Sequence, residues 1–362
     1  MVDKISLNNF KCFEKLDIPL KKVNILAGMN GMGKSTVLQS LLLLRQSYLE
    51  DGLKKGLYLN SRYVKLGNGQ DILYEKSSGD EIGISLEEDG KTYPFVFGYL
   101  PEDDVQPWEK KAENMVSLPV FGKQFLYLSA DRVTPQELYG ITNEKELENR
   151  EFNGNGEYSF QYLNQYGSLD VENPKLVIPD KSGSSLMNQV RLWMDMISPG
   201  VSPQIKVDKQ LRKSEVRYEY VEGRNKTGSY RSVNVGFGIT YVLPIVIALL
   251  SARENDMILL ENPEAHIHPR GQRKLGELIA AVGSGNVQII LETHSDHILN
   301  GIRIAVKNEK VSPEDINLLY FYKDEADYRH KVKNPKLYAD GRLSEWPDGF
   351  MDEWDQALLE LL

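Results

Sequence analysis

The chain has 362 residues, long enough to bury one large hydrophobic core or two ordinary ones. A hydrophobic fraction of 41% and a charged fraction of 26% are typical of a soluble globular protein. The net charge of −9 excludes a protein drawn as a whole to nucleic acid or to an acidic membrane, so such contact needs a local basic patch. The single cysteine, Cys12, excludes an internal disulfide, and the N-terminus lacks a secretory pattern, so we expect a cytoplasmic protein.

The first hundred residues predict a strand-rich region with one helix. Residues 4–27 predict two or three strands, and the last of these, VNILA, leads into glycine. Residues 36–48 (TVLQSLLLLRQSY) predict a helix that is buried on most faces. Residues 52–100 carry glycines, tyrosines and short alternating patterns, which indicate a small antiparallel β lobe.

Residues 101–231 are the least regular part of the sequence. Within them, QFLYLSA predicts a strand, residues 141–185 predict loops, and residues 186–197 predict an amphipathic helix. The segments RYEYV and SYRSVNV flank EGRNKTG and predict a hairpin.

From residue 232 onward the pattern alternates between helix and strand. The predicted segments are a helix at 241–252, a strand at 257–261, a helix at 269–284 and a strand at 287–295. Alternation of helices with fully apolar strands predicts an α/β fold with a parallel sheet covered on both faces. The C-terminal residues 343–362 predict a closing amphipathic helix.

Residues 232–252 carry no charge over a length that would span a bilayer. However, the segment also contains Asn234, Gly236, Gly238 and a central Pro244. We therefore expect a glycine-rich turn followed by a buried helix, and no membrane contact.

The strongest motif is GMNGMGKS, from Gly28 to Ser35, which matches the phosphate-binding pattern G-x-x-x-x-G-K-[ST]. It lies between a predicted strand and a predicted helix, which is the context that the motif requires. The glycines let main-chain N–H groups point at phosphate oxygens, Lys34 adds a positive charge, and Ser35 supplies an oxygen to Mg²⁺. The predicted ATP-binding set is Asn30, Gly31, Gly33, Lys34, Ser35 and Thr36.

Two apolar strands end in polar residues farther along the chain. MILLENPEAHIHP places Glu261 at the carboxyl end of a strand, where a carboxylate can hold Mg²⁺ through water. QIILETHSDH places His294 at the end of the next strand, within reach of a γ-phosphate.

Together these motifs resemble the ABC-type P-loop ATPases of the RecF/SMC group, and in particular the bacterial ATPases related to the OLD (overcoming lysogenization defect) proteins. The opening ISLNNFKCF…LDIPLKKVNILAGMNGMGKST, ENPEAHIHP and ETHS carry the resemblance, which covers residues 1–50 and 230–300 clearly. It implies an ABC-type head with a mixed, mainly parallel sheet, an antiparallel β lobe and an α/β insertion. The implied parts are 1–100 and 232–362 as the two halves of the head and 101–231 as the insertion.

The resemblance also implies roles for individual residues. Glu261 takes the Walker B position and His294 that of the switch histidine. NVGFG occupies the place of the ABC signature, so Ser232, Gly236 and Gly238 would meet the γ-phosphate of an opposing subunit. Gln70 is the candidate for the metal-contacting glutamine of the β lobe.

The sequence departs from the family pattern at the catalytic base. The usual Asp-Glu-Pro reads Glu261-Asn262-Pro263 here, and an amide orients water without accepting its proton, so we expect slow hydrolysis. Glu264 is the candidate substitute. The signature is not a clean Leu-Ser-Gly-Gly-Gln. We also expect no TOPRIM nuclease of the OLD kind, because the sequence ends soon after ETHS.

These observations predict an ATP- and Mg²⁺-dependent switch that dimerises on ATP and controls a separate effector protein, in antiphage defence or DNA maintenance. One alternative is a metal-dependent nuclease that uses His266, His268 and His294, and another is an ATP-binding scaffold without turnover. DNA or RNA contact is a further hypothesis, because residues 206–231 hold eight Lys or Arg against four Asp or Glu.

Overall fold

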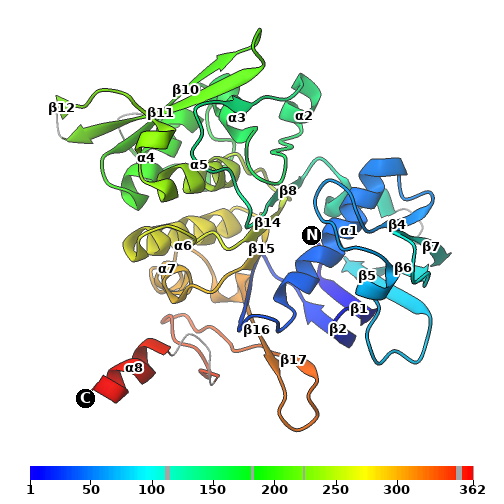
Figure 1. The fold of residues 1–362 in the computed structure, drawn as a ribbon. Helices are drawn as coiled ribbons and strands as arrows, with labels where there is room; N and C mark the ends of the chain where they lie inside the picture. Colours follow the sequence, from blue (N-terminus) through cyan, green and yellow to red (C-terminus); the bar gives the residue numbers. More distant parts are fainter. Residues whose placement is uncertain (111–114, 181–182, 223–224, 348–352, 362) are drawn as a thin grey trace. The chain divides into compact units, whose positions relative to one another are not determined.

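The computed structural model describes residues 1–110, 115–180, 183–222, 225–347 and 353–361 (Figure 1). They form two compact units. The first unit contains Met1–Phe125, Ile316–Leu337 and Leu343–Leu362, and the second contains Leu126–Asp315 and Tyr338–Arg342. The three-part organisation expected from the sequence stays a prediction.

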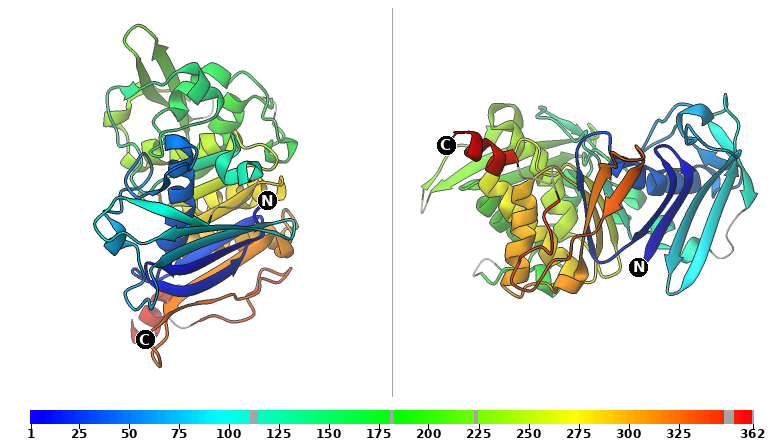
Figure 2. Two further views of the ribbon diagram at one scale, coloured as in Figure 1. Left: turned by 90° about the vertical axis from the view of Figure 1, so that its right-hand side faces the viewer. Right: turned by 90° about the horizontal axis from the view of Figure 1, so that it is seen from below.

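The first unit contains the predicted antiparallel β lobe. Its six strands follow the order β2-β1-β5-β6-β7-β4, and each pair of neighbouring strands is antiparallel (Figure 2). The strands are β1 (Lys4–Phe10), β2 (Phe13–Pro19), β4 (Gly56–Tyr58), β5 (Glu81–Glu88), β6 (Lys91–Gly98) and β7 (Val105–Lys110). Alternate residues such as Ile5, Leu7 and Ile84 are fully buried, which is the period-two pattern of a sheet with one covered face. The lobe therefore recruits β1, β2 and β7 from outside the predicted range 52–100.

The same unit carries a strand–loop–helix segment. Strand β3 (Val23–Gly28) pairs in parallel with β16 (Ile316–Lys323), and β17 (His330–Lys333) pairs antiparallel to β16. Helix α1 (Lys34–Asp51) follows β3 and ends at Gly52, which adopts the left-handed conformation with φ +71°. Both the last strand before the glycine loop and the buried helix confirm the sequence prediction.

The first unit is completed by short helices and the C-terminal helix. Its 3-10 helices are η1 (Gly69–Asp71), η2 (Met115–Ser117) and η3 (Pro119–Phe121). Helix α8 (Glu353–Leu361) falls in the segment predicted to form an amphipathic helix, part of which, 348–352, lies outside the described residues.

The second unit contains the predicted parallel strands with their helices. Strand β14 (Met257–Glu261) pairs in parallel with β15 (Gln288–Glu292), and β8 (Phe125–Leu128) neighbours β14. The helices are α5 (Phe237–Leu250), α6 (Pro269–Ser284) and α7 (Asp296–Lys307). Helices α6 and α7 lie side by side, and each has a glycine at the point where the two helices meet (Figure 2). A Cβ on Gly276 would come within 2.3 Å of the Ile298 carbonyl oxygen, and one on Gly301 within 2.1 Å of that of Arg273.

The second unit also holds a small antiparallel sheet. Its strands are β9 (Tyr139–Gly140), β10 (Val201–Asp208), β11 (Lys213–Glu222), β12 (Asn225–Lys226) and β13 (Tyr230–Arg231). The remaining helices of the second unit are α2 (Glu144–Glu148), α3 (Ser159–Tyr166), η4 (Pro174–Leu176), α4 (Leu186–Ile197), η5 (Ser232–Asn234) and η6 (Pro313–Asp315). The predicted helix at 186–197 is confirmed. The predicted hairpin pairing is confirmed, because β11 pairs antiparallel with β13, although through two residues, and part of its turn, 223–224, lies outside the described residues. Strand β11 also pairs along eight residues with β10, which was not predicted.

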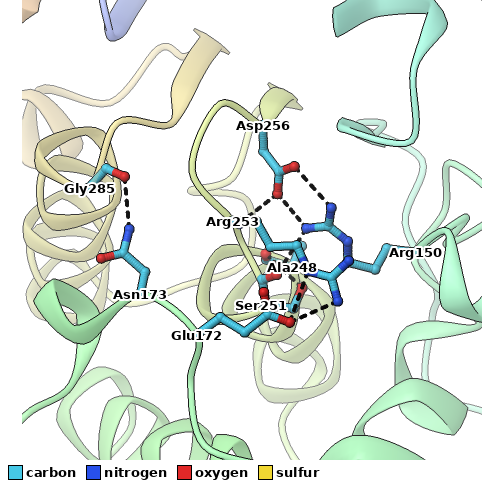
Figure 3. Close-up of polar contacts among 8 residues, drawn as sticks. All are labelled: Arg150, Glu172, Asn173, Ala248, Ser251, Arg253, Asp256 and Gly285. Atoms are coloured by element: carbon cyan, nitrogen blue, oxygen red, sulfur yellow. Dashed lines mark hydrogen bonds and ion pairs between the residues drawn. The ribbon is translucent and has the colours of Figure 1, made fainter.

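A buried ion pair fastens the segment after α2 to the start of β14 (Figure 3). The Arg150 guanidinium donates to both carboxylate oxygens of Asp256, with Nη2 2.9 Å from Oδ1, and also to the Ser251 carbonyl oxygen at 2.9 Å. Both side chains are at most 2% exposed. On the surface nearby, Arg253 pairs with Glu172 at 2.8 Å.

The uncharged segment 232–252 forms the short helix η5, a turn and helix α5, whose residues Thr240–Leu250 are buried. This confirms the prediction of a glycine turn followed by a buried helix. Across the described ranges, no helix combines the length and the apolar character needed to cross a membrane.

Candidate nucleotide site

The glycine loop Gly28–Ser35 joins β3 to α1 in the first unit. Gly28, Gly31 and Gly33 have φ values of +138°, +78° and +97°, which side chains rarely adopt. A Cβ on Gly28 would lie 2.2 Å from the Phe321 carbonyl oxygen, and one on Gly33 would lie 2.7 Å from Cys12 Sγ. The loop therefore needs glycine for both conformation and space. It leaves main-chain N–H groups at the start of an 18-residue helix, where an anion is stabilised.

The residues that follow the glycines place charge and hydroxyl groups at that helix start. Lys34 is 3% exposed, and its Nζ donates to the carbonyl oxygens of Gly28 and Met29 at 2.7 and 2.8 Å. Its ammonium is thereby held against the loop. Ser35 is half-buried, and Thr36 Oγ1 lies 3.7 Å from Cys12 Sγ. Asn30 and Gly31 are exposed at the tip of the loop.

In the second unit, Glu261 ends strand β14, where its carboxylate accepts two hydrogen bonds. The donors are the Tyr127 hydroxyl, at 3.1 Å, and the Ala130 main-chain N–H, at 3.0 Å. Burial and the neighbouring Glu261 charge raise the pKa of Tyr127, so this hydroxyl stays protonated and donates. The carboxylate is thus held at the strand end in a fixed orientation.

Arg132 holds the main chain at the same place. Its Nη1 donates to the Glu261 carbonyl oxygen at 2.6 Å and its Nη2 to that of Asn262 at 2.7 Å. The guanidinium lies 4.1 Å above the Tyr241 ring and is 2% exposed. The sequence indicates a role for Arg132 only through its place in a polar turn directly after the apolar strand QFLYLSA. That signal does not distinguish a functional arginine from a local ion pair.

Asn262 is held in an uncommon conformation, with φ +40°. Its main-chain N–H donates to the Glu292 carbonyl oxygen at 2.8 Å. Its side-chain Oδ1 is buried and accepts no hydrogen bond from the residues that the structure describes. A buried acceptor of this kind costs free energy unless it serves a ligand or a water molecule.

Glu264 and His294 are brought together, as their positions after adjacent strands suggest. The Glu264 carboxylate accepts the His294 main-chain N–H at 2.7 Å and the Thr293 hydroxyl at 2.8 Å. Burial raises the pKa of Glu264 despite these two donors. The His294 residue itself is exposed.

The histidine cluster of the nuclease hypothesis does not form. Within the described part of the chain, no group of three or more His, Cys, Asp or Glu side chains could hold a metal ion. The His266 ring packs 4.5 Å from that of Phe237 and 5.3 Å from that of Tyr241. His268 Nδ1 instead accepts the Arg270 main-chain N–H at 3.3 Å, which caps helix α6. Packing and capping therefore account for these two histidines.

The signature segment NVGFG precedes helix α5. Gly236 is exposed at its N-cap, whereas a Cβ on Gly238 would lie 2.0 Å from the His266 carbonyl oxygen. Gly238 therefore has a packing reason to be glycine. Ser232 is fully buried; its hydroxyl accepts from Tyr139 and donates to the Gln136 carbonyl oxygen. In this arrangement it does not reach a ligand, in contrast to the γ-phosphate contact that the family resemblance implies.

Gln70 lies in helix η1 of the first unit, with an exposed side chain. Its main-chain N–H donates to the Pro101 carbonyl oxygen at 3.1 Å. Among the described residues, no contact of the Gln70 side chain indicates a metal site. The assignment of Gln70 as a metal-contacting residue stays a prediction.

Three models of known protein families match the chain, and together they cover most of its length. A family model described as "AAA ATPase domain" matches residues 1–191, more than half of the 362-residue chain. A model described as "AAA domain, putative AbiEii toxin, Type IV TA system" matches residues 143–300. A third, described as "Protein of unknown function (DUF3696)", matches residues 311–361.

Among curated proteins, the DNA replication and repair protein RecF of Cytophaga hutchinsonii is 28% identical over 121 residues. That match covers 33% of this chain and spans only 29% of the RecF protein.

Two solved structures share the fold. The SmcHead bound to the C-winged helix domain of ScpA aligns with a TM-score of 0.55 and 14% identity, over 93% of this chain and 98% of that one. An Smc head domain with an extended coiled coil, bound to the C-terminal domain of ScpA derived from Pyrococcus furiosus, aligns with a TM-score of 0.53 and 13% identity, over 99% of both chains. The α/β fold predicted from the sequence is therefore confirmed as that of an ABC-type head. The chain belongs to the AAA ATPase domain family.

Proposed function

We propose that this protein binds Mg-ATP and uses it to close a homodimer that controls a separate effector. The observation that carries the proposal is the glycine loop, whose left-handed glycines and buried Lys34 start a long helix. Bound there, the nucleotide would supply a phosphoanhydride and Mg²⁺ an electrophilic centre. Lys34 and the loop N–H groups would bind phosphate oxygens, and Ser35 and Glu261 would hold the metal.

The dimer proposal draws support from the surface around the signature segment. Val233 and Phe237 are 44% and 38% exposed, and Phe237 packs on the exposed residue His266. Gly236 leaves the N-terminus of α5 open, and its first turn has no acidic residue. An apolar rim around an exposed helix N-terminus suits a second protomer that brings a bound triphosphate.

Hydrolysis by this chain would depend on how water is activated. Asn262 Oδ1 can accept a hydrogen bond and orient a water molecule, but it cannot take up a proton. Glu264 lies two residues after Asn262 in the sequence. Burial raises the pKa of its carboxyl group, which also accepts the His294 N–H, so we propose Glu264 as the general base. The second candidate function, an ATP-binding scaffold without turnover, rests on Asn262 alone.

The effector and the pathway are proposed from the relatives. Their names refer to DNA replication and repair, to a putative AbiEii toxin of a Type IV TA system, and to an Smc head bound to ScpA. These names are consistent with an OLD-like role in antiphage defence or DNA maintenance, with a protein partner and with DNA or RNA as a ligand. They carry the proposal by analogy of fold and family.

The test is steady-state ATP hydrolysis across a range of protein concentrations, with Lys34→Ala as the blank. We expect turnover per protomer to rise with concentration, because the active site is shared. Phe237→Glu should abolish that rise while ATP binding is retained, and Leu169→Glu, at an exposed leucine elsewhere, should leave it unchanged. Turnover per protomer that is constant with concentration would contradict the shared-site dimer. ATP binding without turnover would favour the scaffold.

A further inference from the structure

A basic cavity of about 540 Å³ lies in the second unit, and none of its lining residues is assigned above to ATP, metal or signature. Helix α6 contributes Arg273, helix α7 contributes Asn300, Arg303 and Lys307, and the turn 338–342 contributes Asp340 and Arg342. Its volume is within the range of pockets that bind small molecules. Such a cavity is more than a solvated helix face, because three separate segments line it.

The walls of the cavity are held by specific contacts. Arg303 Nε donates to the Gly341 carbonyl oxygen at 2.7 Å, and Nη1 donates to Asn300 Oδ1 at 2.7 Å. Gly341 has φ +82°, and a Cβ there would lie 3.0 Å from the Arg303 carbonyl oxygen. The turn is closed by the Tyr338 N–H, which donates to the Arg342 carbonyl oxygen at 2.9 Å. These contacts seat the turn against α7 and orient the guanidinium.

The lining has a charge opposite to that of the chain. It contains three arginines and one lysine against one carboxylate, whereas the net charge of the protein is −9. Two of the four cations have acidic neighbours: Arg273 pairs with Glu277 and Arg342 with Asp340, each at 2.6 Å. Lys307 forms no ion pair with any residue in the described ranges. Burial lowers the pKa of Arg303, as expected for a cation removed from water.

We propose that this cavity binds a phosphate-bearing anion, either a free polyphosphate such as a nucleotide or the backbone phosphates of a nucleic acid. Arginine suits such a ligand because its planar donors match phosphate oxygens in pairs. Residues 297, 300, 304 and 307 follow the i, i+3, i+7, i+10 spacing that lines one helix face, so Asn300 and Lys307 line the same cavity. The site is independent of the ATP site, and the proposal does not rest on the proposed function.

The test uses the full chain carrying Lys34→Ala, so that binding at the glycine loop is removed. The two probes are inorganic tripolyphosphate and a fluorescent 12-nucleotide single-stranded DNA, each titrated at several salt concentrations. The variant is Lys307→Glu, and the matched control is Lys310→Glu, the same charge reversal three residues on and outside the cavity. We expect Lys307→Glu to weaken binding about tenfold and Lys310→Glu to leave it nearly unchanged.

Each outcome has a definite meaning. Loss confined to tripolyphosphate supports a small anionic ligand, and loss confined to the oligonucleotide, with a shallower salt dependence, supports nucleic acid. Loss of both supports the shared phosphate chemistry. If neither probe binds, or if the two variants weaken binding equally, the proposal is overturned. A thermal unfolding curve shows whether Lys307→Glu is folded, and Lys307→Gln, with a smaller loss in the same order, replaces it if it is not.

Discussion

The guanidinium of Arg132 donates to the main-chain carbonyl oxygen of Asn262 across 2.7 Å, although 130 residues separate them. The same group holds the carbonyl oxygen of Glu261, so one arginine fixes two consecutive residues at the end of β14. Both of these contacts are to the main chain, so Arg132 would act through the position of these two residues. We therefore regard it as a positioning residue for the water-activating segment.

Substitution of Arg132 should lower turnover without lowering ATP affinity. Hydrogen bonds from a charged donor contribute about 1.5–3 kcal/mol, so we expect Arg132→Met to reduce kcat roughly 10–100-fold. Arg132→Lys, which keeps the charge but loses the paired donors, should recover only part of this. Kinetics with a separate ATP-binding titration measure both quantities. A parallel loss of ATP affinity would point to a general structural role instead.

Glu264 gives a pH-dependent prediction. A general base must be ionised, and burial raises the pKa of this carboxyl above its ordinary value. We therefore expect kcat to fall as the pH decreases through that raised pKa, at a higher pH than for an exposed glutamate. Glu264→Gln should lower turnover by about 10²–10⁴-fold with ATP binding intact. A Glu264→Gln variant with the turnover and pH profile of the original protein would assign water activation to another group.

Cys12 offers a chemical probe of the glycine loop. Burial raises the pKa of its thiol, so alkylation by iodoacetamide should be slow at neutral pH and should accelerate only above the pH of an ordinary thiol, about 8.5. A Cβ on Gly33 would lie 2.7 Å from this sulfur, so the thiol lies against the loop and an adduct on it would crowd the loop. We expect alkylation to reduce ATP affinity at least tenfold, as measured by titration of labelled ATP.

The control for this experiment is Cys12→Ser, which should bind ATP as the original protein does and resist the reagent. An alkylated protein with unchanged ATP affinity would show that the loop does not depend on this contact.

The elements that could be predicted from the sequence are those with a local signal. Helices 186–197 and 269–284 were located to the residue, because their apolar period and flanking residues are contained within each segment. The strands ending at Glu261 and Glu292 are short apolar runs. The pairing of β10 with β11 was not predicted, because it depends on tertiary contacts, whereas the hairpin partner β13 follows β11 closely along the chain.

Within the candidate site, the limit is distance along the chain. The glycine loop is a contiguous motif, and its geometry agrees with the sequence pattern. By contrast, the His-x-His pattern left a metal site open as an alternative to packing, and only the contacts of Phe237 and Tyr241 with His266 decide between the two. The contacts of Arg132 with residues 261 and 262 likewise depend on how distant segments fold together.

The buried pair Arg150–Asp256 should contribute far more to stability than its surface neighbour. Asp256→Asn leaves the Arg150 cation buried without its counter-charge, which we expect to cost about 3–5 kcal/mol. The matched control is Glu172→Gln at the exposed Arg253–Glu172 pair, where about 0–1 kcal/mol is expected because water screens both charges. Urea unfolding of the two variants measures the difference. A double variant, Arg150→Met with Asp256→Leu, should be more stable than Asp256→Asn, because it buries no charge at all. Equal losses from Asp256→Asn and Glu172→Gln would show that the buried pair does not hold the segment after α2 in place.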